Sequence, residues 1–261
     1  MSRYSRNSGY TIGGPVNLGG VMTPIVKYLI IINFVVFFFE ILLGENVKPF
    51  ILFFGLVPQK VLSDLYLWQP LTYGFLHSPV DPFHIILNML MLWLFGIGFE
   101  RMWGARRFLL FYLIGGLAGG AAVVLAALLF GSPRYIPTIG ASGAIYALIM
   151  AFGVWFPEQR INIYFFIPVK AKWVVWGIVF VTLLYAITVS DATVSYAAHG
   201  GGLFAGYIMT SGIYRPPIFR ARMKRLGLKL RETAYKIELW ILRRKHRHLR
   251  RLDKDDDEYY H

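Results

Sequence analysis

The sequence contains no cysteine, and this absence excludes disulfide bonds, thiol nucleophiles and cysteine-ligated metal sites. Charged residues are also scarce, at 16% of the 261 residues, whereas 56% are hydrophobic. A soluble domain of this length needs more charge to cover its surface, and the apolar residues here form long blocks rather than alternating patterns. The composition therefore predicts a polytopic membrane protein.

Acidic residues are few, 14 against 27 Lys and Arg, which gives a formal net charge of +13. Such a charge can indicate nucleic-acid binding, but fifteen of the basic residues lie after residue 214, beyond the last apolar block. We therefore expect no nucleic-acid partner. The basic tail, 214–261, suits an interfacial helix on anionic lipid, and a simple topology signal explains it equally well.

Six apolar blocks approach the roughly 17 to 25 residues that a membrane-spanning helix needs. The expected fold is therefore an all-α bundle with six spans, at 26–43, 84–99, 108–130, 141–156, 173–189 and 196–213. Residues 23–213 form this core, and 1–22 form a polar, Gly-rich tail with no apparent cleavable signal peptide. The mixed segment 44–80 has apolar pieces too short to span, so we expect an interfacial, partly re-entrant loop.

The basic residues predict the orientation, because cytoplasmic loops carry an excess of Lys and Arg. They gather in the loops after the second and fourth spans and in the C-terminal tail. Both termini are therefore expected in the cytoplasm. The segments 44–80, 131–140 and 190–195 are expected to face outward.

Four polar residues stand out inside the predicted spans, where polar groups are costly and are candidates for function. They are His84 and Asn88 in the second span, Ser142 in the fourth and His199 in the sixth, each near the outward end. The fourth span is short, since its sixteen residues reach only ~24 Å against a hydrocarbon core of ~30 Å. Ser142 is therefore expected below the outer surface, in a pocket that admits water.

Ser142 by itself is compatible with three roles: a helix cap, a small residue for helix packing, or a nucleophile. Imidazole is the usual base for a serine nucleophile, and His199 supplies one at the same depth. His84 and Asn88 are spaced i and i+4, so they share a helix face and can donate hydrogen bonds to an oxyanion. The Ser142 backbone N–H, at a helix N-terminus, is a further donor.

Five more residues are expected to support this site: Gly140, Gly143, Tyr146, Gly202 and Gly206. The first two glycines allow a substrate backbone to approach closely. The tyrosine lies one turn after Ser142 and is placed to pack against the His199 ring. The last two glycines form a GxxxG pair, which we expect to pack the sixth span against the fourth.

These motifs resemble those of the rhomboid family of intramembrane serine proteases: Gly140-Ala141-Ser142-Gly143 with Tyr146, His84-x-x-x-Asn88, and His199-x-x-Gly202-x-x-x-Gly206. The resemblance covers about residues 24–213, and "ERMWG" (100–104) and "IPVKAKW" (167–173) are similar to segments of bacterial members. One departure is the segment "SPVDPF" between His77 and His84, which is longer than the usual spacing and leaves the role of His77 open.

The resemblance implies a serine endopeptidase with Ser142 as nucleophile, His199 as general base and no acidic third member. It implies transmembrane protein substrates cut in or near their spanning segments, no metal and no cofactor. It also favours a bacterial inner (plasma) membrane, and the orientation predicted from the basic residues has the active site opening outward. Two alternatives stay open: a non-catalytic relative that binds or retains membrane clients, and a transporter with a helix broken at 140–143.

Overall fold

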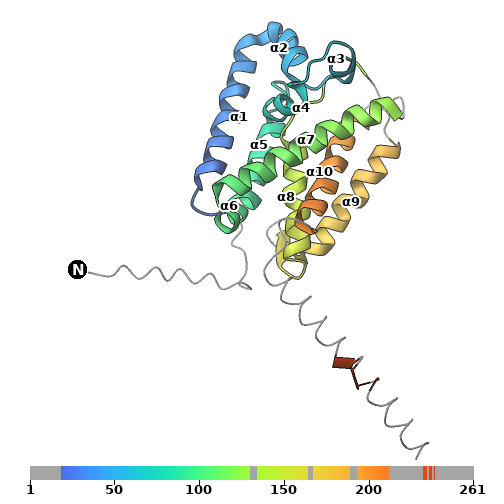
Figure 1. Cartoon of the computed structure of the whole chain (residues 1–261). Helices are drawn as coiled ribbons and strands as arrows, with labels where there is room; N and C mark the ends of the chain where they lie inside the picture. Colours follow the sequence, from blue (N-terminus) through green and yellow to red (C-terminus); the bar gives the residue numbers. More distant parts are fainter. Residues whose placement is uncertain are drawn as a thin grey trace, which may run out of the picture. The chain divides into compact units, whose positions relative to one another are not determined.

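The structure is a computed structural model (Figure 1) that describes residues 19–129, 134–163, 167–188 and 193–211, together with five positions between 232 and 238. The chain divides into two compact units, Met1–Tyr214 and Arg215–His261. In the second unit, Lys236 and Glu232 form an ion pair with 2.7 Å between Nζ and Oε1. The interfacial helix predicted for the tail otherwise lies outside the described residues.

The first helix, α1 (Pro24–Leu43), begins with proline at a position where the missing N–H costs nothing. The predicted loop 44–80 is folded largely into short helices: η1 (Gly44–Asn46), α2 (Val47–Phe54), α3 (Pro58–Ser63), α4 (Gln69–Thr72) and η2 (Tyr73–Phe75). The buried Gln69 side chain ties them together, since its Oε1 accepts the Val57 N–H and its Nε2 donates to the Leu52 carbonyl.

The second predicted span is longer than expected and is not a uniform α-helix. It consists of α5 (Pro82–Met91), a π-helical stretch η3 (Leu92–Gly96) and α6 (Ile97–Trp103). It starts before His84 because Pro82 occupies the first turn and the Asp81 side chain accepts the N–H of Phe83. It ends at Gly104, whose φ of 79° is favourable for glycine.

Four more long helices follow: α7 (Ala105–Leu129), α8 (Ser142–Trp155), α9 (Ala171–Thr188) and α10 (Thr193–Ser211). Their ends agree with the last four predicted spans to within three residues. Among the described residues, three helices are long and apolar enough to cross a membrane: Pro24–Phe54, Pro82–Trp103 and Ala105–Leu129. Helix α8 is apolar but shorter. The chain is therefore a mostly helical membrane protein.

A two-stranded antiparallel hairpin between α8 and α9 was not expected from the sequence. Strand β1 (Arg160–Ile163) pairs with β2 (Ile167–Lys170), with Arg160 opposite Lys170. The Glu158 carboxylate bridges Lys170 and Lys172 at the base of the hairpin. Hydrogen bonds from these two ammonium groups lower the pKa of Glu158 to about 2, so it is ionised at neutral pH.

Helices α7, α8 and α10 lie between α1 and α9 (Figure 1) and pack with their backbones in close contact. A Cβ atom added to Gly202 of α10 would lie 2.0 Å from the Gly143 carbonyl oxygen of α8. A Cβ added to Gly206 would lie 2.5 Å from the Ala147 carbonyl oxygen. The GxxxG pair of α10 thus faces α8, and only glycine permits this separation.

Candidate active site

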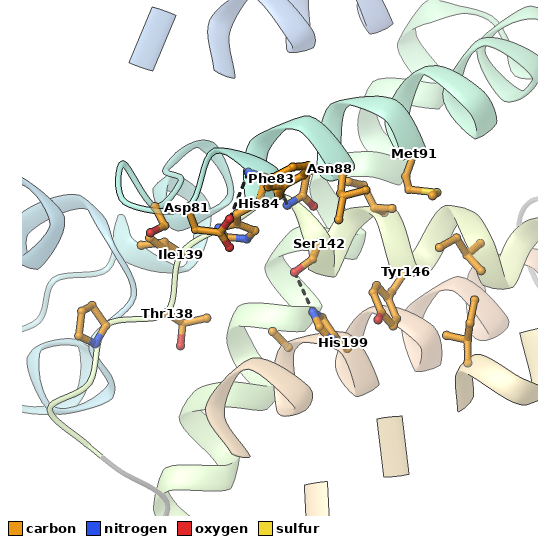
Figure 2. Close-up of a pocket in the computed structure, with 17 residues that line it drawn as sticks. Asp81, Phe83, His84, Asn88, Met91, Thr138, Ile139, Ser142, Tyr146 and His199 are labelled. Atoms are coloured by element: carbon orange, nitrogen blue, oxygen red, sulfur yellow. Dashed lines mark hydrogen bonds between the residues drawn. The ribbon is translucent and has the colours of Figure 1, made fainter. Parts of the chain in front are cut away.

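Ser142 and His199 lie side by side, although 57 positions separate them in the sequence (Figure 2). The distance between His199 Nε2 and Ser142 Oγ is 2.9 Å, which is a hydrogen bond. The two residues approach because α10 meets α8 at Gly202, about one turn after His199, and at Gly143, directly after Ser142. The close glycine contact therefore sets the distance between the hydroxyl and the imidazole.

The hydroxyl of Ser142 does not cap α8. Ser142 is the first residue of the helix, and the cap position belongs to Ala141, which makes no side-chain capping bond. The serine hydroxyl instead faces the imidazole of His199. Of the three roles open to this serine, the structure excludes the helix cap.

Two aromatic rings hold the His199 imidazole. Tyr146, one turn after Ser142, stacks on it with 4.0 Å between ring centroids and an interplanar angle of 8°. Tyr196 meets it edge-on at 5.8 Å and 87°. Within the described residues, the buried Nδ1 atom of His199 has no hydrogen-bond partner. The orientation of the ring therefore depends on stacking rather than on a carboxylate in the described part.

His84 and Asn88 line the same cavity from α5. The Asn88 side chain donates one hydrogen bond to the His84 carbonyl oxygen at 2.8 Å. Since an amide nitrogen carries two hydrogens, a second N–H is available to another acceptor. Gly140 faces this pair, because a Cβ added there would lie 2.7 Å from His84 Nε2. Its φ of 119° is also one that only glycine adopts without strain.

Tyr73 supports the site and was not predicted from the sequence. Its carbonyl oxygen accepts the Gly140 N–H at 2.9 Å, and its hydroxyl donates to the Gly116 carbonyl at 2.8 Å. A Cβ added to either Gly119 or Gly143 would lie 2.8 Å from that hydroxyl. Tyr73 thus connects the loop before Ser142 with the crossing of α7 and α8. A tyrosine in a mixed loop gives no signal of this role.

His77, whose role the sequence left open, lies beside His84. Its side chain is fully buried, and its ring lies 5.0 Å from the His84 ring, centroid to centroid. Its backbone N–H donates to the buried carboxylate of Glu40 in α1, at 3.1 Å from one oxygen and 3.3 Å from the other. His77 therefore packs behind His84 rather than in the cavity.

The cavity around Ser142 has a volume of about 590 Å³. Figure 2 shows Ser142, His199, His84 and Asn88 converging on it. Apolar side chains from three helices form much of its wall: Leu87, Met91, Ile145, Ile149 and Ile178. The described part of the chain contains no group of three or more His, Asp or Glu side chains able to hold a metal ion. The side chains that meet here suit a serine nucleophile with a histidine base.

The chain is thus an integral membrane protein in which a serine and a histidine form a hydrogen bond in a cavity between helices. The sequence profile of the rhomboid domain matches residues 64–216, more than half of the chain. The chain belongs to the rhomboid family.

Individual relatives agree with this membership. The chain is 30% identical to Rhomboid protease GluP of Bacillus subtilis, over 74% of this chain and 36% of GluP. It is 29% identical to the mitochondrial Rhomboid protein 1 of Saccharomyces cerevisiae, over 52% of this chain and 39% of that protein. It is 30% identical to RHOMBOID-like protein 4 of Arabidopsis thaliana, over 72% of this chain and 44% of that protein. The chain thus spans less than half the length of each of these relatives.

Proposed function

We propose that the chain is an intramembrane serine endopeptidase that hydrolyses peptide bonds in or near transmembrane segments of other membrane proteins. The observation that carries the proposal is the 2.9 Å contact between Ser142 Oγ and His199 Nε2 in a cavity of about 590 Å³. Membership of the rhomboid family and the name of GluP, a rhomboid protease, support the same reaction.

In the proposed reaction, His199 is neutral, with its proton on Nδ1, and its Nε2 accepts the Ser142 hydroxyl proton as Oγ attacks the substrate carbonyl carbon. His199 then donates this proton to the leaving amine, and an acyl-enzyme forms on Ser142. A water molecule, deprotonated by His199, attacks the ester and releases the second product, and the proton returns to Ser142. The stacked Tyr146 ring keeps the imidazole oriented through both steps.

The negative charge that develops on the substrate oxygen needs hydrogen-bond donors in place before the reaction. We assign this role to the free N–H of Asn88, the His84 ring and the backbone N–H of Ser142. The Ser142 amide belongs to the first turn of α8, where amides have no acceptor within the helix. Gly140 leaves room for the His84 ring beside the cavity, whereas Gly143 lies against the Tyr73 hydroxyl and Gly119, where it serves helix packing rather than substrate access.

The membrane arrangement is part of the proposal. It has six spans, both termini in the cytoplasm, and a core at 23–213 between an N-terminal tail (1–22) and a basic tail (214–261) that contacts anionic lipid. The site opens outward, and the membrane is a bacterial inner membrane. Helix α8 has 14 residues and reaches only ~21 Å of a ~30 Å hydrocarbon core, which supports a site that lies below the outer surface but admits water.

Replacing Ser142 by alanine tests the function directly. Purified Ser142→Ala should lose all cleavage of a single-span substrate and all labelling by a fluorophosphonate probe, because the attacking oxygen is gone. The control is Ser211→Ala, since the Ser211 hydroxyl bonds to the Ile208 carbonyl of its own helix. Cleavage by Ser142→Ala at the wild-type rate would exclude this serine. Client binding without cleavage or labelling by the wild type would favour the non-catalytic alternative.

A further inference from the structure

The segment between His77 and His84 places a carboxylate at the rim of the cavity. Two prolines, Pro79 and Pro82, restrict its backbone. Asp81 is fixed at three points: its N–H donates to the Ser78 carbonyl, its own carbonyl accepts the His84 N–H, and its Oδ1 accepts the Phe83 N–H. The carboxylate therefore has a defined position at the start of α5.

Asp81 is the only carboxylate among the described residues that line the cavity, and no lysine or arginine joins it there. Its side chain is exposed, and it has no ion-pair partner within the described part of the chain. Because Oδ1 is engaged with the helix N-terminus, Oδ2 is free for a ligand. Figure 2 shows Asp81 near His84 and Ile139, at the opposite end of the cavity from Met91. The rim thus carries one carboxylate that the described residues engage through the start of α5 but not through an ion pair.

The distance from Asp81 to His84 can be estimated from helix geometry. Asp81 precedes His84 by three residues, and a helix rises ~1.5 Å per residue, so Asp81 lies ~4.5 Å beyond His84 along α5. An extended substrate advances ~3.3–3.6 Å per residue. A peptide that runs along α5 towards its N-terminus, with its carbonyl oxygen between His84 and Ser142, brings a side chain within about three residues of that carbonyl to Asp81.

We propose that Asp81 is a specificity-determining residue that favours substrates with a lysine or arginine within about three residues of the scissile bond. This inference rests on the proposed function, because the position of the basic side chain is counted from a scissile carbonyl that lies against Ser142. A long basic side chain extends its ammonium or guanidinium group to Oδ2 while its aliphatic part covers the apolar rim. A glutamate at the same position is repelled.

Binding to Ser142→Ala tests this selection without any need for cleavage. Segments of one single-span substrate carry lysine, glutamine or glutamate at each position in turn along the outward half of the span, and fluorescence anisotropy in detergent at low salt gives the Kd. At one or two positions the segment with lysine should bind about 2- to 5-fold more tightly than the segment with glutamine, the range for a solvent-exposed ion pair. The segment with glutamate should bind less tightly than the glutamine segment by a similar factor. The difference should shrink at 1 M salt, where the Debye length is about 3 Å.

A second substitution, Asp81→Asn in the Ser142→Ala background, isolates the charge. Asparagine caps a helix as well as aspartate does, so α5 and His84 stay in place. The lysine, glutamine and glutamate segments should then bind with one Kd. The matched control is Asp64→Asn, an exposed carboxylate in the same loop region that does not line the cavity, which should leave the lysine preference unchanged.

The outcomes separate this inference from the proposed function. Equal Kd values for lysine and glutamate segments at every position would overturn the role of Asp81, even if the wild type cleaves its substrate. A lysine preference that persists in Asp81→Asn would also overturn it. A lysine preference that Asp81→Asn abolishes, in a wild-type protein that cleaves nothing, would support Asp81 as a selective contact and reject the protease.

Discussion

At the scale of single residues, Gly140 is constrained both by its backbone conformation and by a neighbouring side chain of the candidate site. Its φ of 119° and the 2.7 Å from its ideal Cβ position to His84 Nε2 leave no room for a side chain. Gly140→Ala should lower kcat for cleavage by about 10²- to 10³-fold, the loss typical of one oxyanion donor, because His84 must move. Cleavage assays on a single-span substrate measure this.

The control for this change is Gly74→Ala, since a Cβ at Gly74 meets no atom within 4 Å and its φ is ordinary. It should cleave at a rate close to wild type. Equal rates for the Gly140 and Gly74 variants would show that His84 does not contribute to the reaction.

Which residues form the candidate site was more predictable from the sequence than their backbone conformations and contacts. The spacing of His84 and Asn88 is enough to place them on one helix face, because helical periodicity is local. The φ of Gly140 and the position of Tyr73 were not predictable, since both depend on contacts between the loop before α5 and the loop before α8. Of the alternatives open to Ser142, the helix cap is excluded for a related reason: the hydroxyl faces a histidine 57 positions away.

At the scale of the elements, the contact between α8 and α10 sets the distance from Ser142 to His199. An ideal Cβ on Gly202 lies 2.0 Å from the Gly143 carbonyl oxygen, so Gly202→Ala must push the helices apart. It should cost about 1–3 kcal/mol of unfolding free energy, typical of an overpacked core, and should abolish cleavage. Denaturant titration in detergent measures the first effect and a cleavage assay the second.

Gly200 offers a matched control on the same helix, next to His199, because a Cβ there meets nothing within 4 Å. Gly200→Ala should be neutral or more stable by about 0.4–1 kcal/mol, as alanine restricts the unfolded chain. If Gly202→Ala were as stable and as active as Gly200→Ala, the close backbone contact would not control the site.

The helices themselves were predictable because long apolar blocks leave the backbone few alternatives to a helix in a membrane. The hairpin of β1 and β2 was not, since strands of four residues carry little pattern of their own. The division of the second span into α5, η3 and α6 was also missed, because a π-helical stretch has no periodic signature in so short a segment.

At the scale of the whole molecule, two buried carboxylates attach α1 to the rest of the bundle. Glu100 of α6 accepts hydrogen bonds from the Thr23 hydroxyl and from the N–H groups of Ile25 and Val26 at the start of α1. Glu40, in the last turn of α1, accepts the N–H of His77. The hydrogen bonds to Glu100 hold the N-terminus of α1 against α6. The hydrogen bonds to Glu40 connect the other end of α1 with His77, which packs behind His84.

Glu40→Ala should therefore affect both stability and activity, although Glu40 does not line the cavity. Loss of the carboxylate leaves the buried His77 N–H unsatisfied, which costs about 1–3 kcal/mol of unfolding free energy. Glu40→Gln keeps one acceptor oxygen and should lose less, and the exposed Glu45→Ala should match wild type. Denaturant titration and cleavage assays rank the variants. Because His77 lies against His84, cleavage should fall in the same order as stability, and an equally stable Glu40→Ala would disprove this attachment.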